Sequence, residues 1–126
     1  MDGSLEDQLY ARYPLIFQER SLPETKSAMY LGIGTGNGWF HLIDVLCAAL
    51  QRETDTDRAP QVVATQVKEK FGGLRFYTHE ITERQASMIE LARDLSERTC
   101  DVCGAPGSPV AVGRRRATRC NSHADS

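Results

Sequence analysis

The alternation of apolar and polar residues along the chain predicts three helices and one β-hairpin. The strongest helical pattern covers residues 38–52, where apolar side chains recur three and four positions apart and form one stripe: Trp39, Leu42, Ile43, Leu46, Ala49 and Leu50. The polar residues from Thr54 onward are expected to form a loop after this helix. A shorter helix is predicted to begin at Ser4, with Asp7 three residues later, and to end near Pro14.

The third helix is predicted from its capping sequence. Thr82 followed by Gln85 is the pattern of a capping box, in which the two residues satisfy backbone N–H groups of the first turn. We expect the helix to continue to about residue 98 and to bury four apolar side chains: Met88, Leu91, Ala92 and Leu95.

Between the second and third helices the pattern changes to the period of two that is typical of β-strands. Val63, Thr65 and Val67 alternate with their neighbours, and residues 74–78 form the expected return strand. On that strand Leu74 and Phe76 share one face, while Arg75 and Tyr77 share the other. Glycine adopts the positive φ of tight hairpin turns, so the turn is expected at Gly72-Gly73, with Phe71 in the core.

Glycine occupies every second position from Gly32 to Gly38, directly before the longest helix. This stretch resembles the glycine-rich cofactor turns of methyl-donor-dependent methyltransferases and, less closely, of dinucleotide-binding folds. In those folds a second parallel strand follows, whereas this chain continues into a polar loop and then a hairpin. We therefore interpret the stretch as a bend after a short strand near residues 28–33. Asn37 would cap the helix, Gly38 would start it and Trp39 would anchor it.

These elements predict a small α+β fold: an antiparallel β-hairpin or small sheet packed on two to three helices, with a C-terminal zinc-knuckle or ribbon-like module. We expect residues 1–98 to form the core domain and residues 99–126 to form the zinc-binding module packed on it. Hydrophobic residues make up 40% of the 126-residue chain and charged residues 25%, which are ordinary values for a globular protein. The net charge of −2 gives no overall attraction to nucleic acid or membrane.

The strongest chemical signal lies in the last 28 residues. Cys100 and Cys103 form a C-x2-C pair, Cys120 and His123 form a C-x2-H pair, and sixteen residues separate the pairs. Four sulfur and nitrogen donors without a carboxylate favour one tetrahedral zinc ion over magnesium or calcium. Because four protein ligands close the coordination sphere, the ion is expected to be structural. It would also order a tail that has few large apolar residues.

Two other uses of these cysteines are less compatible with the sequence. Two disulfides would require the fourth cysteine, Cys47, which falls in the predicted helix and is expected to be a small core residue. A redox C-x-x-C motif normally opens a helix, whereas Cys100 follows one. The acidic start of the chain differs from a secretory signal, and the apolar run of residues 45–50 is too short to span a membrane. We therefore expect a cytoplasmic protein with no membrane partner.

Several segments together resemble a family of small uncharacterised proteins encoded by phages, prophages and their bacterial hosts. The matching segments are GWFHLIDVLCAAL, VVATQVKEKFGGLRFY, SERTCDVCGAPG and the closing C-x-x-H, and the resemblance covers residues 29–123. In relatives the last cysteine often follows a strand that contains tryptophan, whereas here it follows RRRATRC. The resemblance implies a phage or mobile-element protein that acts in the cytoplasm of a host cell, and it implies no particular activity.

Two basic clusters are candidate partner-binding sites. Four arginines between the ligand pairs suit phosphate contacts, and they equally suit a role in solubility: Arg114, Arg115, Arg116 and Arg119. A basic strand face with an aromatic residue can bind single-stranded nucleic acid, although lysines also protect sheet edges: Lys68, Lys70, Arg75 and Tyr77. The sequence also allows a homodimer through an exposed hairpin edge.

No nucleophile–base pair or carboxylate pair stands at a catalytic spacing, so the sequence favours binding without catalysis. Our first hypothesis is a protein that engages, and could inhibit, a host protein such as a defence factor. The second is a nucleic-acid-binding regulator that uses the zinc module and its arginines. The third is a methyl-donor-dependent enzyme that uses the glycine-rich turn.

Overall fold

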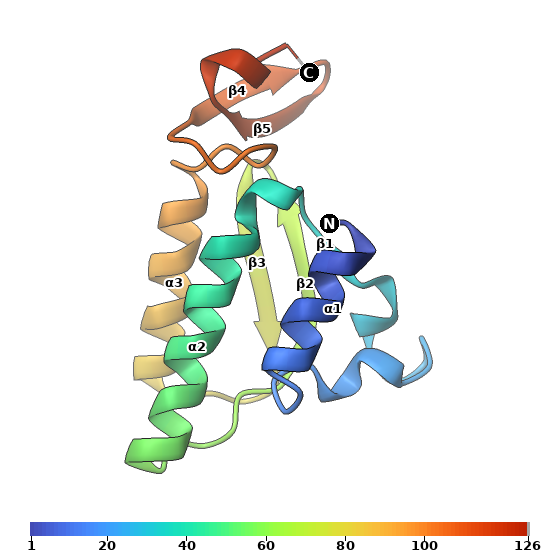
Figure 1. The fold of residues 1–126 in the computed structure, drawn as a ribbon, viewed down its shortest axis with the longest axis vertical. Coiled ribbons are helices and arrows are strands. Elements are labelled where there is room, and N and C mark those ends of the chain that lie inside the picture. The colour runs from blue at the N-terminus through green and yellow to red at the C-terminus, as the bar shows by residue number, and fades with distance from the viewer. Residues whose placement is uncertain (126) are drawn as a thin grey trace.

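The computed structural model describes residues 1–125 and confirms an α+β fold (Figure 1). The α-helices are α1 (Gly3–Arg12), α2 (Phe40–Asp57) and α3 (Glu83–Ser96). The strands are β1 (Ile33–Gly34), β2 (Ala64–Lys70), β3 (Gly73–Thr78), β4 (Ser108–Val112) and β5 (Arg115–Arg119). Short 3-10 helices cover Gln18–Ser21, Ala28–Leu31, Asn37–Trp39 and Asn121–His123.

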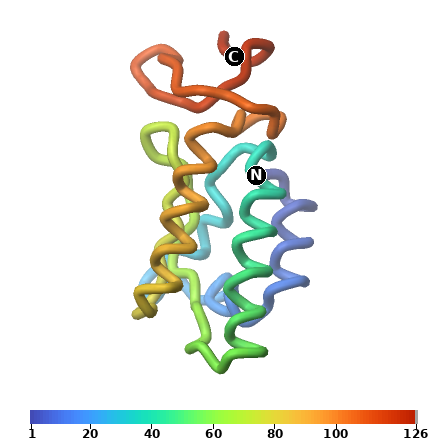
Figure 2. The backbone as a smooth tube through the Cα atoms, turned by 90° about the vertical axis from the view of Figure 1, so that its left-hand side faces the viewer, coloured from blue at the N-terminus to red at the C-terminus, as the bar shows by residue number. Residues whose placement is uncertain are grey.

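The main sheet has the order β1-β2-β3, with β1 parallel to β2 and β3 antiparallel to it. The α1 and α2 helices lie in front of this sheet and α3 runs beside β3, while no α-helix of residues 1–125 covers the opposite face of the hairpin (Figures 1 and 2). The β4–β5 hairpin forms a second sheet beyond the ends of α2, α3 and the first hairpin. The tail that carries the cysteines is therefore placed across one end of the core.

The core lies between α1, α2 and the sheet. Trp39, Ile43, Leu46 and Leu50 of the predicted stripe supply its centre, whereas Leu42 and Ala49 are only partly buried. Cys47 is fully buried in the core, as expected. Leu74 and Phe76 are buried on the sheet face toward the helices, which confirms the predicted faces of β3. On β2 a bulge between Ala64 and Gln66 interrupts the simple alternation, so that Ala64 and Val67 are both buried.

Three predicted helix boundaries differ from the structure. The α2 helix continues to Asp57, where Arg58 in the left-handed conformation ends it. Polar side chains bond within this last turn, since the Thr56 hydroxyl donates to the Arg52 carbonyl at 2.7 Å. Residue 2 rather than Ser4 precedes α1, and Asn37 does not cap α2, because its side chain hydrogen-bonds Asp2 instead. Residues 28–31 form a 3-10 helix before the two-residue strand β1.

The hairpin turn is displaced by one residue from its predicted place. Lys70 pairs with Gly73, so the two turn residues are Phe71 and Gly72, which have φ values of 55° and 84°. Phe71 was expected in the core, but 70% of its surface is exposed. The register places Phe71 at the first turn position, and Gly72 is held at the second, because its amide donates to the Glu69 carboxylate at 2.7 Å and its carbonyl accepts from Thr118 at 2.6 Å.

The capping box of α3 is confirmed, and its predicted buried face is partly wrong. Thr82 accepts from the Gln85 backbone and the Gln85 side chain accepts from Thr82 in return. The helix turns Gln85, Ala92 and Ser96 toward the core, whereas Leu91 and Leu95 are 61% and 50% exposed. Ser96 also accepts a hydrogen bond from the Leu74 amide at 2.8 Å. The edge of β3 thus bonds to α3 at that point.

Candidate metal centre

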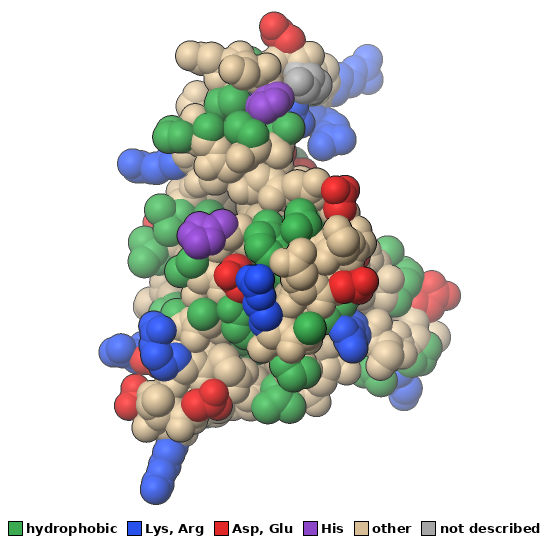
Figure 3. All heavy atoms as spheres, viewed as in Figure 1, with side chains coloured by type: hydrophobic (Ala, Val, Ile, Leu, Met, Phe, Trp, Pro, Cys, Tyr) green, Lys and Arg blue, Asp and Glu red, His purple; other side chains and the backbone are tan. Residues whose placement is uncertain are grey.

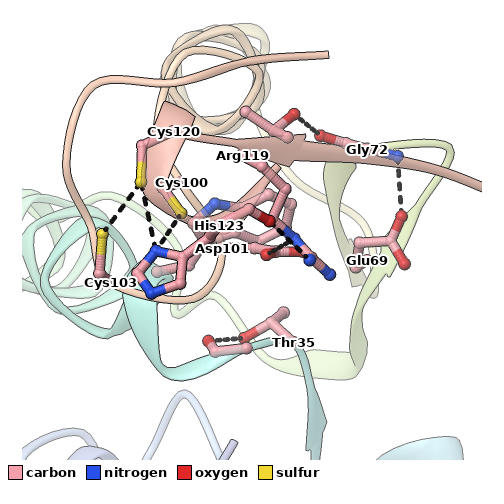
Figure 4. Close-up of polar contacts among 12 residues, drawn as sticks. Thr35, Glu69, Gly72, Cys100, Asp101, Cys103, Arg119, Cys120 and His123 are labelled. Atoms are coloured by element: carbon pink, nitrogen blue, oxygen red, sulfur yellow. Dashed lines mark hydrogen bonds and ion pairs between the residues drawn. The ribbon is translucent and has the colours of Figure 1, made fainter. Parts of the chain in front are cut away.

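Four donor atoms converge at the end of the tail, as the spacing of the cysteines predicts. The sulfurs of Cys100, Cys103 and Cys120 and a ring nitrogen of His123 all lie within 4.8 Å of one another (Figure 4). Cys100 and Cys103 come from the turn after α3, and Cys120 and His123 come from the segment directly after β5. The β4 and β5 strands lie between the two pairs in the sequence, and their antiparallel pairing brings the two pairs together. The tail therefore contains a Cys3His cluster that could hold one metal ion.

The distances between the donors fit a small tetrahedral ion. Two sulfurs bound to one zinc ion at about 2.3 Å stand roughly 3.8 Å apart at the tetrahedral angle. The Cys103 and Cys120 sulfurs are 3.7 Å apart, and Nδ1 of His123 lies 3.7 Å from Cys100 and 3.2 Å from Cys120. Calcium and magnesium prefer oxygen donors, which this set of sulfur and nitrogen atoms does not provide. The donor set is consistent with zinc.

Cys100 is the ligand most strongly prepared for binding as a thiolate. Burial alone would raise the pKa of its thiol, but backbone N–H groups of Cys120, Cys103 and Val102 outweigh burial and lower it to about 6. The pKa of Cys103 is raised, because burial and the adjacent Cys120 and Cys100 outweigh a backbone hydrogen bond from Ala105. A bound cation would favour the thiolate form of every cysteine in the cluster.

The glycine-rich stretch is the surface on which the first metal-binding turn rests. A Cβ on Gly36 would lie 2.9 Å from the Asp101 carbonyl carbon, and one on Gly38 would lie 2.6 Å from the Gly104 nitrogen. The Gly38 amide donates to the Asp101 carbonyl at 2.9 Å. Gly36 and Gly38 therefore allow two backbones to touch. The space that a cofactor would need beside these glycines is filled by the Cys100–Gly104 turn.

A second group of contacts fixes the tail to the core on either side of this turn. The indole of Trp39 donates to the Thr99 carbonyl at 2.8 Å, and the Thr118 hydroxyl donates to the Gly72 carbonyl at 2.6 Å. Within the tail, Arg119 forms an ion pair with Asp101 at 2.6 Å and donates to the His123 carbonyl at 3.3 Å. The two ligand pairs are thus joined by an ion pair as well as by the cluster.

The structure places the predicted partner-binding residues in four locations. Lys68, Arg75 and Tyr77 lie on the open face of the hairpin, since Lys68 pairs with Arg75 and Gln66 with Tyr77. Lys70 is exposed at the hairpin end. Arg114, Arg115 and Arg116 are exposed at the β4–β5 turn, and Arg115 reaches Glu69 at 3.8 Å. Arg119 is nearly buried in its pair with Asp101.

Three contributions to the site were not found from sequence. Asp101 gave no signal because its partner, Arg119, is eighteen residues away and belonged to an arginine-rich run. The contact of the tail with Gly36 and Gly38 joins segments more than sixty residues apart. Val45, which is 53% exposed, forms an apolar surface with Leu91 and Leu95, and helical periodicity alone marked the two leucines as core.

No protein-family model, curated protein or solved structure matches this chain. None of the helices formed by residues 1–125 has the length and hydrophobicity needed to span a bilayer.

The hydrogen bond from Trp39 to the tail can be tested by replacing Trp39 with phenylalanine. The change leaves the buried Thr99 carbonyl without its donor, so we expect unfolding to become easier by about 1–3 kcal/mol. Hydrogen exchange should accelerate most in residues 99–107. Tyr13→Phe removes a hydrogen bond to Asp44, away from the tail, and is the control. Equal exchange of the tail in both variants would contradict the proposed role of the indole.

Proposed function

We propose that this protein is a zinc-stabilised binding domain, without catalytic activity, that engages another protein through a groove between α2 and α3. The observation that carries the proposal is a continuous apolar surface that the fold leaves uncovered. The metal cluster has four protein donors, so the bound ion would keep no coordination position for a substrate. The function therefore depends on a binding surface of the protein and not on a substrate bound to the metal.

The groove has a volume of about 640 Å³ and is lined mainly by apolar side chains. Leu42, Val45 and Ala49 form the α2 wall, while Met88, Leu91 and Leu95 form the α3 wall. Figure 3 shows hydrophobic side chains gathered at the left-hand edge of the molecule, over these two helices. Monomeric proteins rarely expose large connected apolar patches, and such patches mark sites of association.

The shape of the groove suits a helix from a partner. Two neighbouring helices form its walls, and an amphipathic helix binds such grooves with apolar side chains spaced three and four residues apart. Burying one leucine side chain fully contributes about 1.5–3 kcal/mol, so the exposed leucines supply enough apolar surface for specific binding. Polar neighbours such as His41 and Thr99 would orient the partner.

The metal centre connects to this groove directly. Cys103 and Gly104 form one end of the groove, next to Gly38 and Thr99. A bound ion would hold Cys103 in place and so fix the shape of that end. Partner binding should therefore depend on the metal, although the ion itself touches no partner.

The resemblance to phage and prophage proteins suggests the identity of the partner. For a protein produced inside a bacterial host, the partner would be a host protein, and occupying one of its helices would block that protein's own contacts. Inhibition of a host defence factor is the role that this arrangement suits best. This role needs binding alone.

The proposal can be tested by nuclease-treated affinity capture from the organism that encodes the chain. Leu91→Glu places a charge in the groove, and we expect it to lower recovery of the specific partner at least about tenfold. Leu31→Glu changes a similarly exposed leucine outside the groove and should leave recovery unchanged. Equal recovery with both variants, or recovery that disappears after nuclease treatment, would contradict a protein partner at this site.

A further inference from the structure

The tip of the β2–β3 hairpin carries an exposed aromatic residue in a strained conformation. Phe71 has a φ of 55°, a value that residues other than glycine, asparagine and aspartate seldom adopt. Its side chain is 70% exposed, and Nζ of Lys70 lies 5.5 Å from the centre of its ring. Strain of this kind clusters at functional sites, where surrounding contacts hold it in place.

The surrounding structure fixes this turn from both sides. The Gly72 amide donates to the Glu69 carboxylate at 2.7 Å, and the Gly72 carbonyl accepts from the Thr118 hydroxyl at 2.6 Å. These bonds hold the turn backbone while leaving the Phe71 ring in solvent. Asparagine or glycine would satisfy the same backbone without strain. The turn therefore needs the φ value and does not need the aromatic ring.

The open face of the hairpin behind this turn is basic. Lys68 and Arg75 are cross-strand neighbours, and Tyr77 pairs with Gln66 on the same face, opposite Val67 and Phe76. Tyr77 is 42% exposed, and none of the α-helices in the described part of the chain lies over this face (Figure 2).

The charges on this face are available for a ligand. Lys68, Lys70 and Arg75 form no ion pair with any carboxylate in residues 1–125. The acids closest to them are already engaged, Glu69 with Arg115 and Glu97 with Arg93. The local excess of positive charge contrasts with the overall net charge of −2.

The metal-binding tail adds further charge beside the hairpin tip. Because Thr118 bonds to Gly72, β5 lies over the turn and Arg115 reaches Glu69. By the period of two Arg116 shares a face of β5 with Thr118, which contacts Gly72, so Arg116 also adds charge beside the tip. Arg58 is an exposed arginine at the end of α2 opposite the tail (Figure 1), and it serves as the control for total charge.

We propose that the hairpin, through Phe71, Tyr77, Lys68, Lys70 and Arg75, binds single-stranded nucleic acid. The cations would contact successive phosphates, and the two exposed rings would stack on unpaired bases. A flat basic strand face with aromatic side chains is the arrangement by which several sheet proteins hold single strands. This surface is separate from the α2–α3 groove, so it adds a second binding activity.

Fluorescence anisotropy with labelled oligonucleotides of about 12 nucleotides, a length within known single-strand site sizes, provides the test. Separate titrations with single-stranded DNA, single-stranded RNA and duplex DNA identify the ligand. We expect single-stranded DNA, single-stranded RNA or both to bind more tightly than duplex DNA. With three or four phosphate contacts, the logarithm of affinity should fall against the logarithm of salt with a slope of about −2 to −3.

Phe71→Asn is the decisive variant because Asn-Gly is a favoured sequence for a turn with two positive φ values, so the fold should be preserved or improved. It should weaken binding about tenfold, whereas Phe71→Tyr should retain it. Lys68→Ala or Arg75→Ala should weaken binding and reduce the salt slope by about 0.7. Arg58→Ala should change affinity less than about twofold, and Leu91→Glu in the groove should not change it.

Three results would overturn the proposal. The first is no saturable binding of any single strand at low salt. The second is unchanged affinity in Phe71→Asn. The third is an equal loss in Arg58→Ala and Arg75→Ala, which would show a non-specific response to total charge. Loss of partner capture in Leu91→Glu with intact nucleic-acid binding would separate this activity from the one proposed for the groove.

Discussion

Replacing Gly38 with alanine is expected to displace the metal-binding tail from the core. The added Cβ would lie 2.6 Å from the Gly104 nitrogen and 2.8 Å from the Asp101 carbonyl carbon. Backbone atoms cannot move aside as a flexible side chain can, and both belong to the Cys100–Gly104 turn, which carries two of the candidate metal ligands. We expect a loss of at least about 3 kcal/mol in the free energy of unfolding, at the upper end of the cost of overpacking. Thermal unfolding of the metal-bound protein measures it.

Two other glycines in the same chain are controls for this substitution. Gly34→Ala would bring a Cβ within 3.3 Å of the Lys68 Cβ, a contact that a small local shift would relieve, so we expect a smaller loss than in Gly38→Ala. Gly3→Ala has nothing within 4 Å and lies in α1, where alanine is the better helix former. If Gly38→Ala unfolds at the same temperature as Gly3→Ala, the tail does not rest on the glycine-rich turn.

Removing the metal is expected to release the tail while the core remains folded. The tail buries few large apolar side chains, and a zinc-finger site contributes on the order of 10 kcal/mol to folding. The core has its own buried cluster around Trp39, Ile43 and Phe17. In the presence of a chelator, hydrogen exchange should become fast in residues 99–125 and stay slow in α2 and the β2–β3 hairpin. Returning zinc under reducing conditions should restore protection.

Cysteine variants show whether that protection comes from the cluster. Cys120→Ser removes one ligand and should mimic the chelator, whereas Cys47→Ala changes a buried cysteine of α2 and should leave the tail protected. A tail that stays protected in the chelated wild-type protein would mean that the contacts with Trp39 and Gly72 hold it without metal. A chelator that unfolds the whole chain would show that core and tail are one cooperative unit.

The sequence specified the metal ligands and the type of most elements because both depend on short spacings. The C-x2-C and C-x2-H pairs, the Thr82–Gln85 capping box and the period of two around Phe76 each involve residues close in the chain. Such spacings depend on local helix, strand and turn geometry, so they can be interpreted without the tertiary structure. The α+β class follows from the same local patterns.

The features that sequence did not specify depend on contacts between distant segments. The glycines from Gly32 to Gly38 looked like a ligand-binding turn or a bend, and only the contact with Asp101 explains Gly36 and Gly38. The turn position at Phe71 depends in part on Thr118, which bonds to the Gly72 carbonyl from β5. Apolar periodicity in α3 identified Leu91 and Leu95 as apolar, but it could not tell whether a neighbouring element covers them.

The two binding surfaces and the metal centre form one physical arrangement. The tail contacts the glycine-rich turn at Gly38 and the hairpin turn at Gly72, so it connects the end of the groove with the end of the basic hairpin. Loss of the metal should therefore weaken both activities, while Leu91→Glu and Phe71→Asn should each weaken one. The bound ion is therefore the feature on which both proposed activities depend.

Native mass spectrometry of protein purified under reducing conditions without added chelator measures the bound metal ion directly. We expect one zinc ion per wild-type chain, and none in a chain that carries Cys100→Ser together with Cys120→Ser. A wild-type chain that binds no metal after exposure to zinc, or that keeps its ion when both ligands are replaced, would contradict the assignment of the Cys3His cluster as the metal centre.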